Sequence, residues 1–364
     1  MATIQEQIRE IEEEIKKTSY NKATSHHIGR LKAKLAKFHD EVEKKSASSG
    51  TGEGYSVKKS GDATVTLVGF PSVGKSTLLN KLTDAHSEVG AYEFTTLTVI
   101  PGVMEYKGAT IQILDVPGLV KGAASGRGRG KEVIAVIRNS DLVLFLLDVF
   151  QPLHLPVLME ELYEAGIRVD QHPPDVVIKK MDRGGVRINS TVELDLDEET
   201  IKTILDEYKI HNATILFREN INVDQLIDVV SKNRSYVSSM TVVNKVDLAY
   251  PKMLEESKKL YPEAVFISAH NSQNLEQLKD VLYERLKFIR IYMKPQGEAA
   301  DMEEPMIVLD GTNIGQICER LHKDFKKKFR FAYVWGPSAK HPGQRVGMDH
   351  KLKDGDVLSI IIQK

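Results

Sequence analysis

The segment GFPSVGKS, residues 69–76, carries the residue types that bind a nucleotide phosphate chain. It fits the pattern G-x-x-x-x-G-K-[ST] through Gly69, Gly74, Lys75 and Ser76. Glycines let backbone N–H groups wrap the phosphates at a helix N-terminus, where the helix dipole also favours anions. We expect Lys75 to reach the β- and γ-phosphates and the Ser76 hydroxyl to ligate Mg²⁺. A chance glycine-rich turn is the alternative, but the β-rich run TVTLVGF before the segment and the amphipathic run after it disfavour this.

A second phosphate-binding pattern, Asp-x-x-Gly, follows at Asp115 and Gly118. We expect Asp115 to hold Mg²⁺ through water and the Gly118 N–H to meet the γ-phosphate. The next position, where Ras-type GTPases keep a glutamine that orients the attacking water, holds Leu119. A leucine cannot orient water, so either hydrolysis is absent or another group does this job. Charged candidates in the same glycine-rich loop are Arg127, Arg129 and Lys131.

The run MTVVNKVD, which contains Asn244, Lys245 and Asp247, predicts the choice of base. An aspartate there accepts hydrogen bonds from guanine N1–H and from the exocyclic amine, and adenine offers neither donor in that place. Asp247 therefore favours GTP over ATP. The run AVFISAH follows, and a backbone N–H at Ser268 or Ala269 could meet guanine O6.

These motifs require a sheet whose strands end at a common edge. From Ala63 onward the pattern alternates strand and helix, and each motif stands at the carboxyl end of a predicted strand, which is where open α/β sheets bind ligands. The expected nucleotide-binding residues are Gly69, Phe70, Pro71, Ser72, Val73, Gly74, Lys75, Ser76, Thr77, Asp115, Gly118, Asn244, Lys245, Asp247, Ser268, Ala269 and His270.

Segments outside this pattern predict further modules. Two apolar helical stripes before residue 46 predict a helical hairpin, which must pack on itself or on the next domain, and SASSGTGEG then predicts a linker. The 91 residues between Asp148 and Met240 exceed what a crossover needs, so we expect an inserted α+β subdomain without catalytic chemistry. From about residue 295, a strand, one helical stripe from Ile314 to Phe329 and two more strands predict a separate small fold.

Composition and charge limit the domain number, the compartment and the kinds of partner to be expected. At 364 residues the chain should hold two or three domains, and a single cysteine, Cys318, fits a reducing compartment and a core position. No apolar run approaches a membrane span and the N-terminus is polar, so we expect a cytoplasmic protein without membrane contact. Net charge is −1, but residues 320–353 hold ten basic and two acidic residues. Either a solvated surface or an RNA-phosphate contact is expected from Lys323, Lys326, Lys327, Lys328, Arg330, Arg345, Lys351 and Lys353.

Several segments together resemble the developmentally regulated GTP-binding proteins, the DRG branch of the Obg-related GTPases. They are GDATVTLVGFPSVGKSTLLNKLT, AYEFTTLTVIPGV, DVPGLVKGA, YKIHNA and VGMDHKLKDGDVL, and the resemblance runs essentially end to end. It implies an α/β fold: a P-loop GTPase domain with an inserted α+β subdomain, an N-terminal helical hairpin and a C-terminal ubiquitin-like (β-grasp) TGS domain. The corresponding ranges are 1–46 for the hairpin, 63–151 and 239–292 for the GTPase domain, 152–238 for the insertion and 293–364 for the TGS domain.

The resemblance also assigns the first switch to the loop FTT. By position Thr96 would bind Mg²⁺ and the γ-phosphate, although spacing alone does not separate it from Thr95. The implied catalytic residues are Lys75, Thr96 and Gly118, and the implied Mg²⁺ ligands are Ser76, Thr96 and Asp115. Leu119 matches the hydrophobic residue of the family. K⁺ beside the phosphates is an alternative aid to hydrolysis, as in relatives with a monovalent-cation site. Those relatives carry Asn where this P-loop has Ser72, and this departure counts against the cation site here.

Two classes of function remain, and in both the association with ribosomes or RNA is what the resemblance implies. The favoured one is a Mg²⁺-dependent GTPase, slow without a cation or partner, that switches a ribosome- or RNA-bound assembly. The alternative is a GTP-gated RNA- or ribosome-binding module with negligible hydrolysis. The resemblance further implies a small dedicated regulatory protein as partner, and we expect a monomer.

Overall fold

The computed structural model describes residues 4–19, 24–48, 60–83, 99–119 and 130–363. The predicted switch residues Thr95 and Thr96, with Arg127 and Arg129, lie outside these ranges. The chain divides into two compact units, one of Met1–Tyr55 with Gly166–Tyr236 and one of Ser56–Ala165 with Val237–Lys364. Within the described ranges, no helix combines the length and the apolar character needed to cross a membrane.

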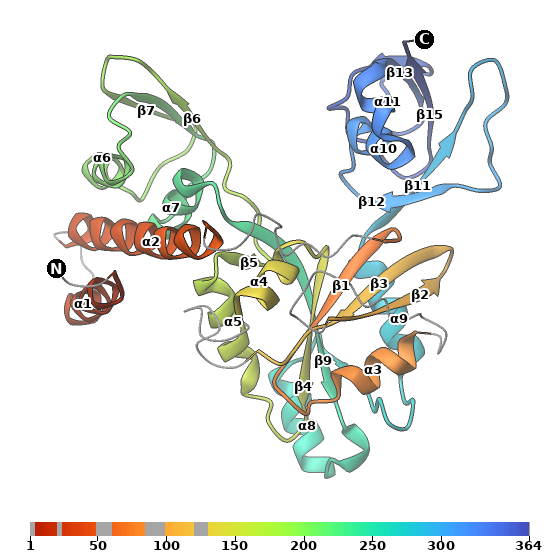
Figure 1. Cartoon of the computed structure of the whole chain (residues 1–364), viewed down its shortest axis with the longest axis horizontal. Coiled ribbons are helices and arrows are strands. Elements are labelled where there is room, and N and C mark those ends of the chain that lie inside the picture. Colours follow the sequence, from red (N-terminus) through yellow and green to blue (C-terminus); the bar gives the residue numbers. More distant parts are fainter. Residues whose placement is uncertain (1–3, 20–23, 49–59, 84–98, 120–129, 364) are drawn as a thin grey trace. The chain divides into compact units, whose positions relative to one another are not determined.

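The second unit is built on a mostly parallel sheet (Figure 1). In spatial order its main strands are β10 (Val265–Phe266), β9 (Ser235–Asn244), β4 (Leu142–Asp148), β1 (Ala63–Val68), β3 (Ala109–Asp115) and β2 (Ile100–Tyr106). Only β2 is antiparallel to its neighbour among these pairings. The short β5 (Ile167–Val169) belongs to the first unit. Near-continuous apolar strands such as LVLFLLD suit a parallel sheet because both faces are buried.

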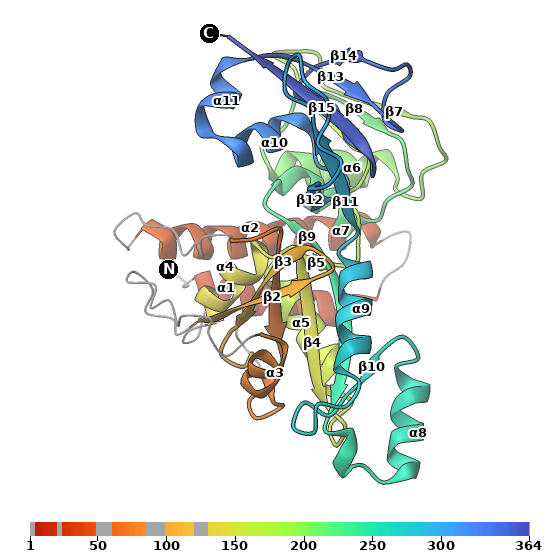
Figure 2. The same ribbon diagram turned by 90° about the vertical axis from the view of Figure 1, so that its right-hand side faces the viewer.

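Helices cover both faces of this sheet. Leucines of α3 (Lys75–Leu82) and α9 (Leu275–Arg285) share one apolar core with alternate residues of β1, β3 and β4. Figures 1 and 2 show α4 (Gly130–Arg138) and α5 (His154–Glu164) on the opposite side, and the 3-10 helix η1 (Val246–Leu248) and α8 (Pro251–Leu260) follow β9. The crossover helix α5 thus belongs to the unit with the sheet, whereas the sequence placed residues 152–238 together in the insertion. Its apolar Leu158 and Leu162 are buried, which explains why it stays there.

The same unit ends in a smaller sheet. Its order is β12-β11-β15-β13-β14, with β11 (Phe288–Met293), β12 (Met306–Leu309), β13 (Phe329–Trp335), β14 (Gln344–Val346) and β15 (Asp356–Ile362). The helix α10 (Ile314–Leu321) packs on one face, and Cys318 is fully buried there as predicted. Because β11 pairs with both β12 and β15, this fold begins at Phe288 rather than at residue 293.

The predicted single helix from Ile314 to Phe329 is wrong. His322 has an extended backbone (φ −167°), and a separate helix α11 (Lys323–Lys328) follows it. The ring of His322 accepts the Asp324 N–H at 3.2 Å and so begins the new helix. The apolar stripe continued across the break because Phe325 and Phe329 still pack on the same core.

The first unit joins the N-terminal hairpin to the inserted segment. Helices α1 (Ile4–Lys17) and α2 (Ser25–Ser48) form the hairpin, so α2 extends into the predicted linker. The insertion contains the small sheet β6-β8-β7 (Val176–Lys180, Ala213–Phe217 and Val186–Ser190), with α6 (Glu198–Glu207) and α7 (Val223–Ser231).

Helix α2 packs against the two helices of the insertion. Gly29 permits a close approach to α6, since a Cβ there would lie 3.2 Å from Thr200 Cγ2, and Lys32 Nζ pairs with Asp224 of α7 at 2.8 Å. The hairpin therefore finds its packing partner in the inserted subdomain.

Candidate nucleotide-binding site

The strand register brings the predicted motifs to one edge of the large sheet. Leu67 of β1 lies opposite Asp115 of β3, and Asp148 of β4 lies opposite Asn244 of β9. The P-loop (residues 69–76) directly follows β1. Because β1 lies between β3 and β4, the P-loop lies at the point where the strand order reverses direction, which is where open α/β sheets bind ligands. The phosphate motifs and the base motif therefore share the carboxyl edge.

The P-loop depends on two glycines for which there is no substitute in this packing. Gly74 has φ +98°, and a Cβ there would lie 2.5 Å from Asn244 Nδ2. A Cβ on Gly69 would lie 2.5 Å from the Leu146 carbonyl oxygen. Ser72 also adopts a left-handed conformation, with φ 64°. The loop thus makes a tight turn between β1 and α3. The backbone N–H groups that follow it lie at the N-terminus of α3, where a helix favours anions.

Lys75 is buried inside this loop. Its Nζ donates to the carbonyl oxygens of Gly69 and Phe70, at 3.2 Å each. Burial lowers the pKa of Lys75, and the nearby Asp115 carboxylate opposes that shift. The two carbonyl oxygens thus accept hydrogen bonds from the ammonium group that phosphate oxygens are expected to accept when a nucleotide binds.

Ser76 and Asp115 meet directly. The Ser76 hydroxyl donates to Asp115 Oδ2 at 2.5 Å. Burial raises the pKa of Asp115, while the Ser76 hydrogen bond and the Lys75 charge act against that rise. Hydroxyl and carboxylate oxygens are the ligands that Mg²⁺ prefers, so this pair fits a magnesium ion beside the phosphates. The third predicted ligand, Thr96, lies outside the described residues.

The Asp-x-x-Gly segment lies against the P-loop. A Cβ on Gly118 would be 2.7 Å from the Pro71 nitrogen, so only glycine allows this contact. Leu119, the next residue, is 2% exposed. Its side chain is therefore packed within the protein and does not face an open phosphate site.

The base motif is tied to the P-loop by side chains. Asn244 Nδ2 donates to the Val73 carbonyl, and Asn244 Oδ1 accepts the Ala269 N–H, both at 2.9 Å. Lys245 Nζ donates to the Ser72 carbonyl at 2.9 Å. Guanine O6 would therefore have to share the Ala269 N–H with Asn244.

The remaining base-site residues lie along the same segments. Asp247 is exposed on η1, as a group that meets a base must be before binding. Ser268 is fully buried, and its hydroxyl accepts the Asn271 N–H at 3.1 Å. Thr77 is exposed in the first turn of α3, and His270 is exposed directly after Ala269.

Two residues at this edge of the sheet contact the predicted site but were not predicted from the sequence. Asp148 Oδ2 accepts from Lys245 Nζ at 2.6 Å and so fixes the lysine against the P-loop. A polar residue at the end of a buried strand was the available signal for it. His154 lies against Phe70, with ring centroids 4.2 Å apart, and no sequence pattern indicated that contact.

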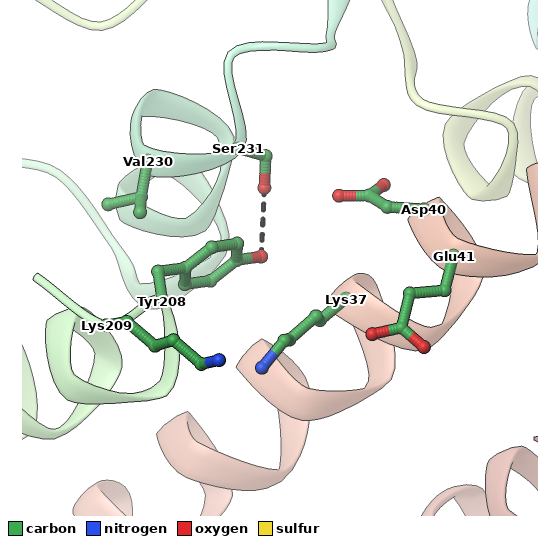
Figure 3. Close-up of a pocket in the computed structure, with 7 residues that line it drawn as sticks. All are labelled: Lys37, Asp40, Glu41, Tyr208, Lys209, Val230 and Ser231. Atoms are coloured by element: carbon green, nitrogen blue, oxygen red, sulfur yellow. Dashed lines mark hydrogen bonds between the residues drawn. The ribbon is translucent and has the colours of Figure 1, made fainter. Parts of the chain in front are cut away.

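A separate hollow in the first unit carries none of this chemistry. It is lined by Lys37, Asp40, Glu41, Tyr208, Lys209, Val230 and Ser231 (Figure 3). Its charges are mixed, and Asp40 already pairs with Arg234 at 3.4 Å. The Tyr208 and Ser231 hydroxyls share a hydrogen bond of 2.9 Å. These contacts make the lining a structural junction of α2, the C-terminal end of α6 and α7.

Three family models match successive parts of the chain. The model described as "50S ribosome-binding GTPase" matches residues 64–180, "C-terminal region of MMR_HSR1 domain" matches 183–288, and "TGS domain" matches 289–362.

Full-length relatives are also similar. An uncharacterized GTP-binding protein of Methanocaldococcus jannaschii is 57% identical over 99% of this chain and 93% of its own length. Developmentally-regulated GTP-binding protein 1 homolog of Dictyostelium discoideum is 48% identical, over 98% of each chain. Developmentally-regulated GTP-binding protein 2 of Bos taurus is 46% identical, over 98% of this chain and 99% of its own.

Proposed function

The chain belongs to the developmentally regulated GTP-binding proteins, P-loop GTPases with a C-terminal TGS domain, and from this we propose that it is a Mg²⁺-dependent switch that hydrolyses GTP to GDP and phosphate in translation. The observation that carries the proposal is the convergence of Lys75, the Ser76–Asp115 pair and the Asn244–Asp247 segment on one sheet edge. We further propose that it binds ribosomes or RNA and a small regulatory protein. We also propose that it is a monomer and acts in the cytoplasm.

Binding would use the fixed parts of the site first. The P-loop N–H groups and Lys75 would hold the phosphates, with the ammonium exchanging the Gly69 and Phe70 carbonyls for phosphate oxygens. Asp247 would accept from guanine N1–H and its amine. Ser76 and Asp115, with Thr96, would hold Mg²⁺, which when bound neutralises charge on the β- and γ-phosphates.

The residues suggest how turnover would be limited. Gly118 would donate its N–H to the γ-phosphate, and Lys75 would stabilise charge that develops on the phosphate oxygens. Leu119 is buried and cannot orient the attacking water. Hydrolysis would therefore be slow until K⁺, a partner or the ribosome supplies the missing group.

A GTP-gated binding module with negligible hydrolysis is the second candidate, and the buried Leu119 is the observation in its favour. The two are separated by GTP turnover measured with and without ribosomes, in potassium and in sodium buffers. The enzyme predicts phosphate release that rises with K⁺ or ribosomes and stops when Mg²⁺ is chelated. GTP binding without phosphate release in every condition would establish the module instead.

A further inference from the structure

One face of the small C-terminal sheet carries a row of aromatic rings. Along β13, Ala332 and Val334 are buried in the core beneath α10. The alternate residues Phe331, Tyr333 and Trp335 are only half-buried, and side chains alternate between the faces of a strand. Their ring centroids lie 5.3 Å apart for Phe331–Tyr333 and 6.1 Å apart for Tyr333–Trp335. The three rings therefore form a continuous strip on the face away from α10.

Cationic side chains lie over the two end rings of this strip. The Arg345 guanidinium lies 4.1 Å from the Phe331 ring centroid, and Arg345 stands opposite Tyr333 in the β13–β14 register. The Lys294 ammonium lies 5.1 Å from the Trp335 ring centroid at the other end of the strip. Both distances are those of cation–π contacts. Positive charge thus lies over the rings at both ends of the aromatic strip.

The residues of β15 that lie opposite the three rings are uncharged. In the β13–β15 register, Phe331 faces Ile361, Tyr333 faces Ser359 and Trp335 faces Val357. Cross-strand partners share a face, so small and apolar residues border the rings on that side. The strip is therefore aromatic, with neighbouring rings inclined by 78° and 46° to one another, and cations lie over the rings at its two ends.

We propose that this aromatic strip, Phe331, Tyr333 and Trp335, binds single-stranded RNA. Unpaired bases stack on aromatic side chains presented by a sheet, and arginine and lysine beside them meet the phosphates. Paired bases are hidden within a duplex and cannot reach the rings. The inference rests on the proposed function only for the choice of RNA as partner, and it is independent of hydrolysis. It also places base contacts on a surface separate from the lysines of α11.

The full-length protein offers a direct optical test, because Trp335 is its only tryptophan. A single-stranded RNA of about 12 nucleotides without self-complementarity should quench its fluorescence, since a stacked base lies on or beside the indole. The same RNA annealed to its complement should quench much less. Tyr333→Ala should weaken binding of the single strand about tenfold or more, whereas Tyr333→Phe should preserve it, because stacking needs the ring and not the hydroxyl.

Two further variants distinguish base stacking on this strip from nonspecific contacts of exposed aromatic or basic side chains. Tyr250→Ala removes an aromatic ring that is 74% exposed elsewhere in the same unit, and it should leave RNA affinity unchanged. Joint replacement of Lys326, Lys327 and Lys328 by Glu should reduce single-strand and duplex binding alike and flatten the salt dependence.

The inference is overturned if single strand and duplex bind equally and Tyr333→Ala binds as the parent does. It is also overturned if neither RNA binds at low salt. GTP turnover measured on the same preparations keeps the two proposals distinct. Hydrolysis without aromatic-dependent RNA binding would reject only the RNA face, and aromatic-dependent binding without hydrolysis would reject only the enzyme. Thermal unfolding of Tyr333→Ala that matches the parent would show that this variant is folded.

Discussion

Asn244, at the end of β9, donates its side-chain amide to the carbonyl oxygen of Val73 in the P-loop at 2.9 Å. The two residues are 171 positions apart in the sequence. Through its other amide atom Asn244 also holds the Ala269 N–H. One buried side chain therefore sets the spacing between the loop that would hold phosphates and the loops that would hold the base.

Asn244→Ala should destabilise the protein even without nucleotide. It leaves a buried carbonyl and a buried N–H without their partner, which costs on the order of 2–4 kcal/mol of unfolding free energy. Denaturant unfolding of the nucleotide-free protein measures this loss. Asn271→Ala, at an exposed position of the same region, is the control and should stay within ~0.5 kcal/mol of the parent. Equal stability of both variants would mean that the two Asn244 hydrogen bonds contribute nothing to the free energy of unfolding.

Asp247→Asn should exchange the nucleotide preference. The amide replaces an acceptor-only carboxylate, so guanine N1–H and the exocyclic amine lose their partner while xanthine gains one. We expect GTP affinity to fall by about 100-fold and XTP affinity to rise. Competition binding with GTP, XTP and ATP measures the change, and Asp349→Asn is the surface control. Equal binding of ATP and GTP by the parent would refute guanine specificity itself.

Ser76→Asn should weaken Mg²⁺–GTP binding more than GDP binding. The hydroxyl within 2.5 Å of Asp115 would be lost from the place where the metal is expected beside the γ-phosphate. Nucleotide affinities with magnesium and with a chelator give the comparison, and the gap between variant and parent should shrink when the metal is removed. Unchanged turnover in the variant would place the metal elsewhere.

Leu119→Gln should not accelerate hydrolysis, although it introduces the Ras-type residue. Leu119 is 2% exposed, so the glutamine would lose apolar burial and bring an amide into the core, at about 2–4 kcal/mol of stability. Single-turnover hydrolysis in potassium and sodium, with thermal unfolding, tests both parts. Leu260→Gln, at a position 47% exposed, should leave stability near that of the parent. A large rate gain from Leu119→Gln would show that the loop positions water as in Ras.

His39 of α2 should make the first unit less stable in mild acid. Burial lowers the pKa of His39, and the opposing influence of Glu12 and Asp40 does not reverse this. The unfolded chain then takes up the proton first, so the stability due to neutral His39 is complete above about pH 6.5 and is lost as pH falls through its folded pKa. Thermal unfolding between about pH 7.5 and 5.5 should show a smaller decline for His39→Gln than for the parent. His211→Gln, at an exposed site, should retain the full decline.

Local sequence patterns were enough to find the large sheet and the motifs at its edge. Each motif directly follows an apolar strand, as Asp115 ends β3 and Asn244 ends β9, and parallel strands bring such ends together. The fold class of a P-loop GTPase with a TGS domain is confirmed by the family matches. The ligand roles of the individual residues stay predictions.

The contacts between distant residues could not be read from the sequence. The Asp148–Lys245 pair depends on which strands are neighbours and in what register, and the Phe70–His154 contact depends on how α5 returns to the P-loop. The break at His322 was hidden because apolar spacing survives a change of helix when both helices pack on one core. The partner of α2 was equally hidden, since an amphipathic face does not name what it packs against.

The pairing of Lys32 with Asp224, 192 residues later in the chain, has a consequence for synthesis. A ribosome releases the N-terminal hairpin first, but the helices that cover α2 emerge only after β1, β3 and β4 have been made. The large sheet must wait in turn, because β9 and β10 are translated after the insertion. The first unit cannot complete its fold before nearly half of the second has been made, and the second cannot complete its fold before all of the first has been made. A nascent chain stalled after α5 would thus expose both an uncovered helix face and an open sheet edge, the two surfaces that a folding factor would have to shield.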